Sequence, residues 1–139
     1  MGLSAEEGAG PAPFEGARRK GRILVVDDEA QIGNTLRLLL DPDYEVVFVT
    51  SARDALARLE TDRRFDVIFC DLMMPVVSGA DFYRELATSA PELIDRLVFM
   101  TGGVFSPQTS EFLESVPNTC IEKPFEIASL LELIRAHVR

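Results

Sequence analysis

Four runs of consecutive apolar residues are spaced along the chain, and each is only four residues long. They cover residues 23–26, 46–49, 67–70 and 97–100. A short run without alternation is typical of a strand that is covered on both faces, as the strands of parallel sheets are. With a weaker fifth run, the sequence predicts strands at roughly 22–27, 45–50, 66–71, 96–101 and 119–122.

Amphipathic stretches lie between and after these runs and predict five helices. The apolar positions that mark them are Ile32, Leu36, Leu39 and Leu40; Ala52, Ala55, Leu56 and Leu59; Phe82, Leu86 and Ala90; Phe112 and Val116; and Ile127, Leu130, Leu131, Ile134 and Val138. Five βα units with right-handed crossovers place helices on both faces of one sheet. The predicted fold is therefore α/β, a flavodoxin-like (βα)5 doubly wound parallel sheet with strand order 2-1-3-4-5.

Composition limits the classes of partner. The chain has 139 residues, enough for one domain with a real core, and a net charge of −9, which disfavours direct binding to nucleic acid. No apolar run approaches the roughly 20 residues of a membrane span, and no signal peptide opens the chain. We therefore expect a cytoplasmic protein without direct membrane contact. Residues 1–21 are rich in Gly, Ala, Pro and Glu and predict a disordered tail or linker, leaving 22–139 as the domain. The two cysteines, Cys70 and Cys120, have no metal-binding spacing and are expected to be reduced.

Polar side chains follow the predicted strands at the point where each strand ends. Asp27 and Asp28 follow the first, Asp71 ends the third, Thr101 ends the fourth and Lys123 follows the fifth. The carboxyl ends of parallel strands share one edge of a sheet, where α/β proteins bind their ligands. Three carboxylates, a hydroxyl and an amine at that edge suggest a cation-assisted phosphoryl site.

The acidic doublet alone has another explanation, because acids also favour the N-terminus of a helix. Two unit negative charges about 5 Å apart repel by about 3 kcal/mol at an effective dielectric near 20. Protonation of one acid, the Lys123 ammonium or a bound cation would relieve this repulsion. Carboxylates and a main-chain carbonyl are hard oxygen ligands that suit Mg²⁺. No single residue is specific for a phosphoryl site, but the set of residues is.

The same segments carry a resemblance to a known family. Residues 23–29 (ILVVDDE) resemble the opening of response-regulator (CheY-like) receiver domains of two-component signalling, and 71–75 (DLMMP), followed by Ser78 and Gly79, resemble their phosphoacceptor loop. Residues 98–103 (VFMTGG) and 122–125 (EKPF) are similar to the last two motifs of that family. The resemblance covers about residues 22–138.

This resemblance implies a role for each matching residue. Asp71 would be the nucleophile that becomes an aspartyl phosphate, Thr101 would bind one phosphoryl oxygen and Lys123 another. Mg²⁺ would be held by Asp27, Asp28, Asp71 and the main-chain carbonyl of Met73. The bond between Lys123 and Pro124 is expected to be cis. The phosphoryl donor would be a histidine kinase or a histidine phosphotransfer protein, and the receiver would be a monomer or weak dimer.

This chain departs from the family pattern at two positions, and three alternative functions remain open. Receivers commonly carry Tyr or Phe three residues before the lysine, where this chain has Cys120, so signalling through an aromatic switch there is excluded. Phosphatases with an aspartyl nucleophile carry a second acid two residues later, where this chain has Met73, which cannot act as a base. The alternatives are a receiver from a hybrid sensor histidine kinase, such a phosphatase, and a binding module that never takes phosphate. By resemblance, the signalling surface would lie near Phe105, Phe112 and Leu113.

Overall fold

The computed structural model describes residues 20–41, 43–103 and 106–138 of the chain. Strands and helices alternate along it, as predicted. The strands are β1 (Gly21–Val26), β2 (Tyr44–Val49), β3 (Val67–Asp71), β4 (Leu97–Thr101) and β5 (Cys120–Glu122). The helices are α1 (Ala30–Leu40), α2 (Ala52–Thr61), α3 (Gly79–Ser89), the 3₁₀ helix η1 (Pro91–Arg96), α4 (Pro107–Ser115) and α5 (Ile127–His137).

All strand pairs in the sheet are parallel, and the strand order is β2-β1-β3-β4-β5. The predicted topology is therefore confirmed. Gly21 pairs with Tyr44 as the first residue of β1, so the strand begins at the last residue of the expected tail, one residue before the predicted domain, while residues 1–19 lie outside the described part of the chain. Within the described residues, none of the helices combines the length and the apolar character that a membrane span requires.

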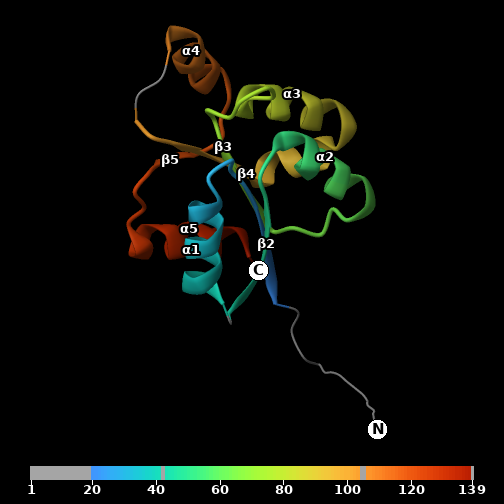
Figure 1. The fold of residues 1–139 in the computed structure, drawn as a ribbon. Helices are drawn as coiled ribbons and strands as arrows, with labels where there is room; N and C mark the ends of the chain where they lie inside the picture. The colour runs from blue at the N-terminus through green and yellow to red at the C-terminus, as the bar shows by residue number, and fades with distance from the viewer. Residues whose placement is uncertain (1–19, 42, 104–105, 139) are drawn as a thin grey trace, which may run out of the picture.

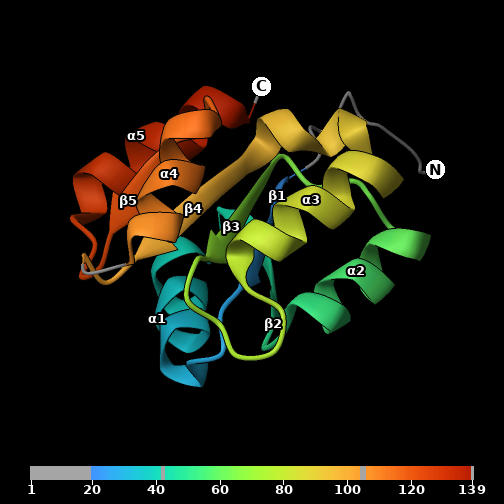
Figure 2. The same ribbon diagram turned by 90° about the horizontal axis from the view of Figure 1, so that it is seen from above.

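The sheet lies between two layers of helices (Figures 1 and 2). Helices α1 and α5 cover one face, where Leu36 and Ile134 pack on Val25 and Phe69 in one buried cluster. Helices α2, α3 and α4 cover the other face, which belongs to a second buried cluster. Both faces of β1, β3 and β4 are buried, which explains why these strands consist of continuous apolar runs.

Several local features differ from the helix pattern predicted from the sequence. Ile127 is 39% exposed, and Val116 and Val138 lie just beyond α4 and α5 as their C-cap residues. Leu39 is 47% exposed, although it was expected on the buried face of α1. Ala90 is buried but lies just beyond α3, as its C-cap residue. The six residues of η1 were not predicted, because two 3₁₀ turns that begin at Pro91 have no periodic apolar pattern to reveal them.

Candidate functional site

The acidic doublet lies where β1 ends. Asp27 is fully buried, and its Oδ1 accepts a hydrogen bond from the backbone N–H of Glu29 at 2.9 Å. Asp28 is exposed. Glu29 is the N-cap residue of α1, but its side chain makes no capping hydrogen bond. The acids therefore do not act as side-chain caps of α1 and are free for another role.

Asp71 ends the neighbouring strand β3 and is also buried. The pairing of Val26 with Cys70 brings the ends of β1 and β3 together. One carboxylate oxygen from each of Asp27, Asp28 and Asp71 lies within 4.8 Å of the other two. The predicted acidic cluster is thus present in space as well as in sequence.

The loop after Asp71 is held against the start of α3. Asp71 Oδ1 accepts a hydrogen bond from Met73 N at 3.2 Å, which orients the carboxylate. Gly79 packs so closely on this loop that a Cβ there would lie 2.7 Å from the Asp71 carbonyl oxygen and 2.8 Å from Leu72 Cα. A capping box between Ser78 and Asp81 defines where α3 begins. Only glycine therefore fits at the first position of this helix without moving the Asp71 loop.

Lys123 supplies the positive charge of the site. Its Nζ lies 2.9 Å from Asp27 Oδ2, 3.1 Å from Glu29 Oε1 and 3.7 Å from Asp71 Oδ2. The lysine follows β5, an edge strand of the sheet. Its backbone N–H donates to the Thr101 carbonyl at 2.8 Å, and its bond to Pro124 is cis, as expected. One cation therefore faces several carboxylates.

The pKa values of the ionisable groups follow from this crowding. Burial raises the pKa of Asp27 above its usual value, although Glu29 N–H and Lys123 act in the opposite direction. Burial also raises the pKa of Asp71, and the charge of Asp27 adds to the effect. Burial lowers the pKa of Lys123, but hydrogen bonds to Asp27 and Glu29 outweigh it, so this pKa is raised overall. The site thus favours fewer negative charges than its acids would otherwise carry.

Thr101 ends β4 as a buried residue, and its Oγ1 accepts a hydrogen bond from Gly103 N at 3.2 Å. Because the hydroxyl is the acceptor in that bond, its own hydrogen stays available to another oxygen. Gly103 has φ +95°, and a Cβ there would lie 2.6 Å from Glu122 Oε2. The glycine is therefore required by the turn itself, in addition to any part it plays in a moving loop.

Asp28, Asp71 and Lys123 line one cleft, whereas the buried Asp27 and Thr101 are not among its lining residues. Its lining residues are Asp28, Glu29, Ile32, Asp71, Met73, Gly102, Lys123 and Pro124. The donor set fits Mg²⁺, because three carboxylates converge, one of them exposed, and Met73 lines the same cleft. Ile32 and Pro124 add apolar surface beside the charged groups.

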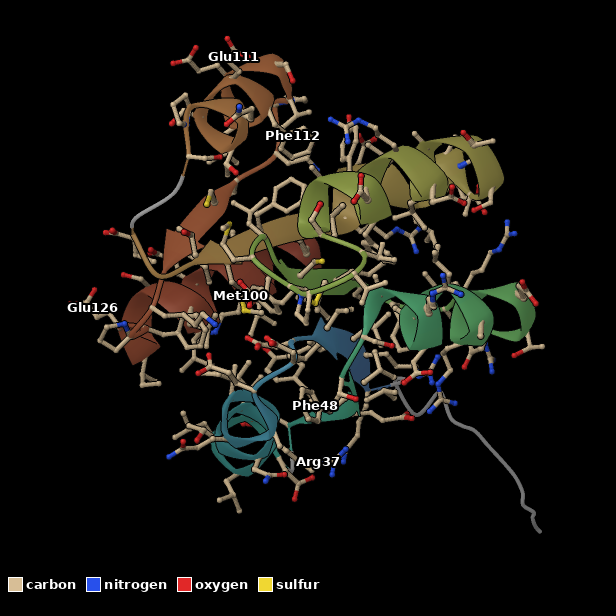
Figure 3. All side chains as sticks on the ribbon, turned by 45° about the horizontal axis from the view of Figure 1, so that its top comes forward. Arg37, Phe48, Met100, Glu111, Phe112 and Glu126 are labelled. Atoms are coloured by element: carbon tan, nitrogen blue, oxygen red, sulfur yellow. The ribbon has the colours of Figure 1, made fainter. Side chains whose placement is uncertain are left out.

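Cys120 opens β5 beside Phe99, where receivers commonly carry an aromatic residue. Within the described residues both cysteines are free thiols, Cys70 buried and Cys120 half-buried. Aromatic rings gather nearby: Phe112 of α4 makes edge-to-face contacts with Tyr83 at 5.5 Å and with Phe99 at 5.4 Å between ring centres (Figure 3). Phe112 is therefore largely a core residue, and Phe105 lies outside the described residues.

Sequence reasoning missed two features of the site. Glu29 was read only as part of a motif, yet it pairs with Lys123 from 94 residues away. Val76, in the loop after Asp71, has φ +68° and is 88% exposed. A β-branched residue with positive φ is strained, and no sequence signal other than the neighbouring Pro75 indicated a turn here.

Residues 23–135 match the response regulator receiver domain family. The chain is 31% identical over 122 residues to the uncharacterized transcriptional regulatory protein YkoG of Bacillus subtilis (strain 168), covering 86% of this chain and 52% of that protein. It is 31% identical over 128 residues to the CAI-1 autoinducer sensor kinase/phosphatase CqsS of Vibrio cholerae, covering 91% of this chain and 18% of that protein. The chain thus spans about half the length of the first relative and under a fifth of the second.

Solved structures agree with this assignment. The chemotaxis protein CheY4 of Vibrio cholerae superposes with a TM-score of 0.73 at 29% identity, covering 86% of this chain and 100% of CheY4. The receiver domain of the sensor histidine kinase PA1611 of Pseudomonas aeruginosa PAO1, solved with a magnesium ion in its active-site cleft, has the same TM-score at 22% identity and covers 86% of this chain and 98% of its own. The chain belongs to the response regulator receiver domain family and is a receiver domain of two-component phosphorelay signalling.

Proposed function

We propose that Asp71 accepts a phosphoryl group from a phosphohistidine and that Mg²⁺ assists the transfer. The metal would be held by Asp27, Asp28, Asp71 and the main-chain carbonyl of Met73. The observation that carries this proposal is the convergence of three carboxylates and the Lys123 ammonium beside one open cleft, which Asp28, Asp71 and Lys123 line directly. A cluster of buried acids with raised pKa values costs stability, and such costs are typical of functional sites.

In the proposed reaction, an Asp71 carboxylate oxygen attacks phosphorus and the bond from phosphorus to the donor imidazole nitrogen breaks. The imidazole keeps the electron pair of that bond, and the phosphoryl group stays on Asp71 as an acyl phosphate. The hydrogen bond from Met73 N holds the carboxylate in one orientation for this attack. When bound, Mg²⁺ supplies positive charge that offsets the charge of the acids and of the phosphoryl oxygens.

Lys123 and Thr101 would bind the phosphoryl oxygens that Asp71 does not carry. The ammonium already lies 3.7 Å from Asp71 Oδ2, within a short side-chain movement of a group bonded there. The free hydrogen of the Thr101 hydroxyl is a second donor. Charge that develops on the oxygens during in-line transfer would thereby be stabilised by an ammonium and a hydroxyl donor.

Met73 favours a signalling role over turnover. It stands two residues after Asp71, and its thioether cannot remove a proton from a water molecule. We therefore expect the acyl phosphate to persist for long enough to act as a signal. This distinguishes the receiver from a phosphatase with an aspartyl nucleophile, and it limits the chain's own catalysis to its phosphorylation and dephosphorylation.

We propose a cytoplasmic receiver, a monomer or weak dimer, with a histidine kinase or a histidine phosphotransfer protein as its donor. A second context is a receiver module within a hybrid sensor histidine kinase. It is favoured by the similarity to CqsS, a sensor kinase/phosphatase, over 91% of this chain. Phosphotransfer profiling against purified histidine kinases and phosphotransfer proteins tests which kind of donor serves this receiver.

The direct test of the proposed function is intact-mass spectrometry with acetyl phosphate and Mg²⁺. The wild-type chain should gain one phosphoryl group, and Asp71→Asn should gain none. Lys123→Ala should still bind Mg²⁺ but respond weakly to phosphate and to beryllium fluoride. If Asp71→Asn accepts phosphate at the wild-type rate, the nucleophile is misassigned. If the wild type gains no mass and shows no spectral change with beryllium fluoride, the proposed function is wrong.

A further inference from the structure

Glu29 is the one acid of the cleft that the proposed function leaves without a role. It follows the metal-binding doublet and caps α1 only with its backbone, because its side chain makes no capping hydrogen bond. The carboxylate turns instead to Lys123, with Oε1 3.1 Å from Nζ. The side chain of Glu29 is 62% exposed, whereas that of Lys123 is only 14% exposed. A solvent-accessible acid therefore holds a nearly buried cation.

The distances show which side of the cleft holds the ammonium. Nζ donates hydrogen bonds to Asp27 at 2.9 Å and to Glu29 at 3.1 Å, both of which follow β1. The distance to Asp71 Oδ2 is 3.7 Å, too long for a good hydrogen bond. An ammonium has three N–H donors, and Asp27 and Glu29, not the phosphoacceptor, accept from two of them.

We infer that Glu29 is a positioning residue that holds Lys123 on the β1 side of the cleft and releases it when Asp71 carries a phosphoryl group. The inference rests on the proposed function, since it concerns the partner that Lys123 gains after phosphorylation. Glu29 and the phosphoryl oxygens compete for the same ammonium. The ion pair thus favours the unphosphorylated state and opposes the phosphorylated one.

Of the two acids that hold Lys123, Glu29 is the one that the lysine gives up when Asp71 is phosphorylated. Asp27 is fully buried and is fixed by the backbone N–H of Glu29, so loss of Lys123 would leave a buried carboxylate without its cation. The carboxylate of Glu29 regains water as soon as the pair opens, which makes its release cheap. Lys123 therefore exchanges Glu29 for a phosphoryl oxygen while it keeps Asp27.

Two substitutions of Glu29 separate the effect of its ion pair with Lys123 from the effect of its negative charge. Glu29→Asp keeps the negative charge at the cleft but is one methylene too short to reach Lys123 in the same way. Glu29→Gln removes the charge and keeps the length. Glu60→Gln, on an exposed position of α2, is the matched control for loss of one negative charge.

The experiment measures beryllium fluoride binding in the presence of Mg²⁺ by ¹⁹F NMR, Mg²⁺ binding alone by calorimetry, and phosphorylation by acetyl phosphate from intact mass. We expect Glu29→Asp to raise the affinity for beryllium fluoride by about 2- to 5-fold, the range set by ion pairs with one exposed partner, and to leave Mg²⁺ affinity unchanged. Glu29→Gln should show the same gain with weaker Mg²⁺ binding, because a nearby negative charge is lost. Glu60→Gln should match the wild type in all three measurements.

A gain in Glu29→Gln without one in Glu29→Asp would overturn the inference, because charge at the cleft would then explain the effect without the ion pair. Unchanged beryllium fluoride affinity in both variants would overturn it as well. In a Lys123→Met background, Glu29→Asp should no longer change the affinity for beryllium fluoride, and a persisting gain contradicts the inference. A wild-type protein that binds no beryllium fluoride and gains no phosphoryl group would overturn the proposed function, and this inference with it. If the wild type binds beryllium fluoride but the Glu29 variants do not, the inference about Glu29 is wrong and the proposed function stands.

Discussion

At the two ends of the parallel sheet, buried charge is arranged in opposite ways. Where β1 begins, the guanidinium of Arg22 is surrounded by acceptors: it lies 3.0 Å from Asp62, 3.3 Å from Glu45 and 2.7 Å from the Arg64 carbonyl oxygen, and 4.5 Å from the ring centre of Phe65. The hydrogen bond from Arg22 lowers the pKa of Asp62 to about 2. Opposite charges are paired at this end.

Where the strands end, like charges face each other. Asp27, Asp28 and Asp71 converge, and Lys123 is the cation that hydrogen-bonds within this cluster. Burial raises the pKa values of both Asp27 and Asp71, the reverse of the shift at Asp62. The first end contributes stability, whereas the second gives up stability and keeps its groups available for a cation and a phosphoryl group.

Removal of Arg22 should have the largest effect on stability. Arg22→Met leaves Asp62 and Glu45 without their shared cation and should lower the free energy of unfolding by about 3 kcal/mol, because one guanidinium loses its hydrogen bonds to two carboxylates and to the Arg64 carbonyl, together with its contact with Phe65. Urea denaturation measures this value. Arg53→Met, at an exposed position of α2, is the control and should change stability by no more than about 0.5 kcal/mol. Equal losses of stability in both variants would mean that Arg22 contributes no more to stability than an exposed arginine does.

The second prediction concerns the backbone that supports Asp71. Gly79→Ala places a methyl group 2.7 Å from the Asp71 carbonyl oxygen, so the loop must shift. We expect a loss of about 2 kcal/mol in stability, as for overpacked sites, together with slower phosphorylation by acetyl phosphate. Gly102→Ala is the matched control, since a Cβ there meets nothing within 4 Å. Normal phosphorylation of Gly79→Ala would show that the loop tolerates the shift.

The third prediction is that a substitution at a buried position raises stability, whereas most such substitutions lower it. Without Mg²⁺, Asp71→Asn should raise the free energy of unfolding by about 1 kcal/mol, because repulsion from the neighbouring acids exceeds the attraction lost at Lys123. With Mg²⁺ in excess, the wild type should recover this difference, since a ligand that binds the folded state stabilises it. Thermal unfolding of both proteins with Mg²⁺ and with a chelator checks the reversal. A destabilised Asp71→Asn protein in chelator would contradict the picture of opposed charges.

The smallest expected effect is the pH dependence of the paired end. The folded pKa of Asp62 is about 2, below the ordinary value of 3.8, so its contribution to stability is present above pH 3.8 and is lost as the pH falls towards 2. Asp62→Asn should flatten the decline of stability over this window. Denaturant midpoints measured between pH 5 and pH 2, roughly the range in which native carboxylates take up protons, test it. Parallel curves for wild type and variant would show that Asp62 is not held by Arg22 in solution.

Much of this molecule could be predicted from residue patterns. The continuous apolar runs indicated buried parallel strands, and the strand order placed Asp27, Asp28 and Asp71 at one crevice, as the distances confirm. These predictions succeeded because they depend on local chemistry and on topology rules that hold for most α/β proteins.

Other features depend on exact contacts between distant segments. The pairing of Glu29 with Lys123 requires side chains 94 residues apart to meet, and no local pattern around Glu29 reveals it. The partners of Arg22 lie on β2 and on the loop before β3, so a strand-opening arginine looked like an ordinary polar residue. The exposure of Leu39 likewise depends on how α1 is turned against the sheet.

Residue patterns along the chain specify which kinds of residue stand at each strand end, because the apolar runs define where strands stop. The same patterns specify the fold class, the acidic crevice and the lack of an aromatic side chain at position 120. Which charges are paired and which are opposed depends instead on the packed fold. Ion pairs form over a few ångströms, and only the packed sheet brings Arg22 to its acids at one end and gives Lys123 to Asp27 and Glu29 at the other.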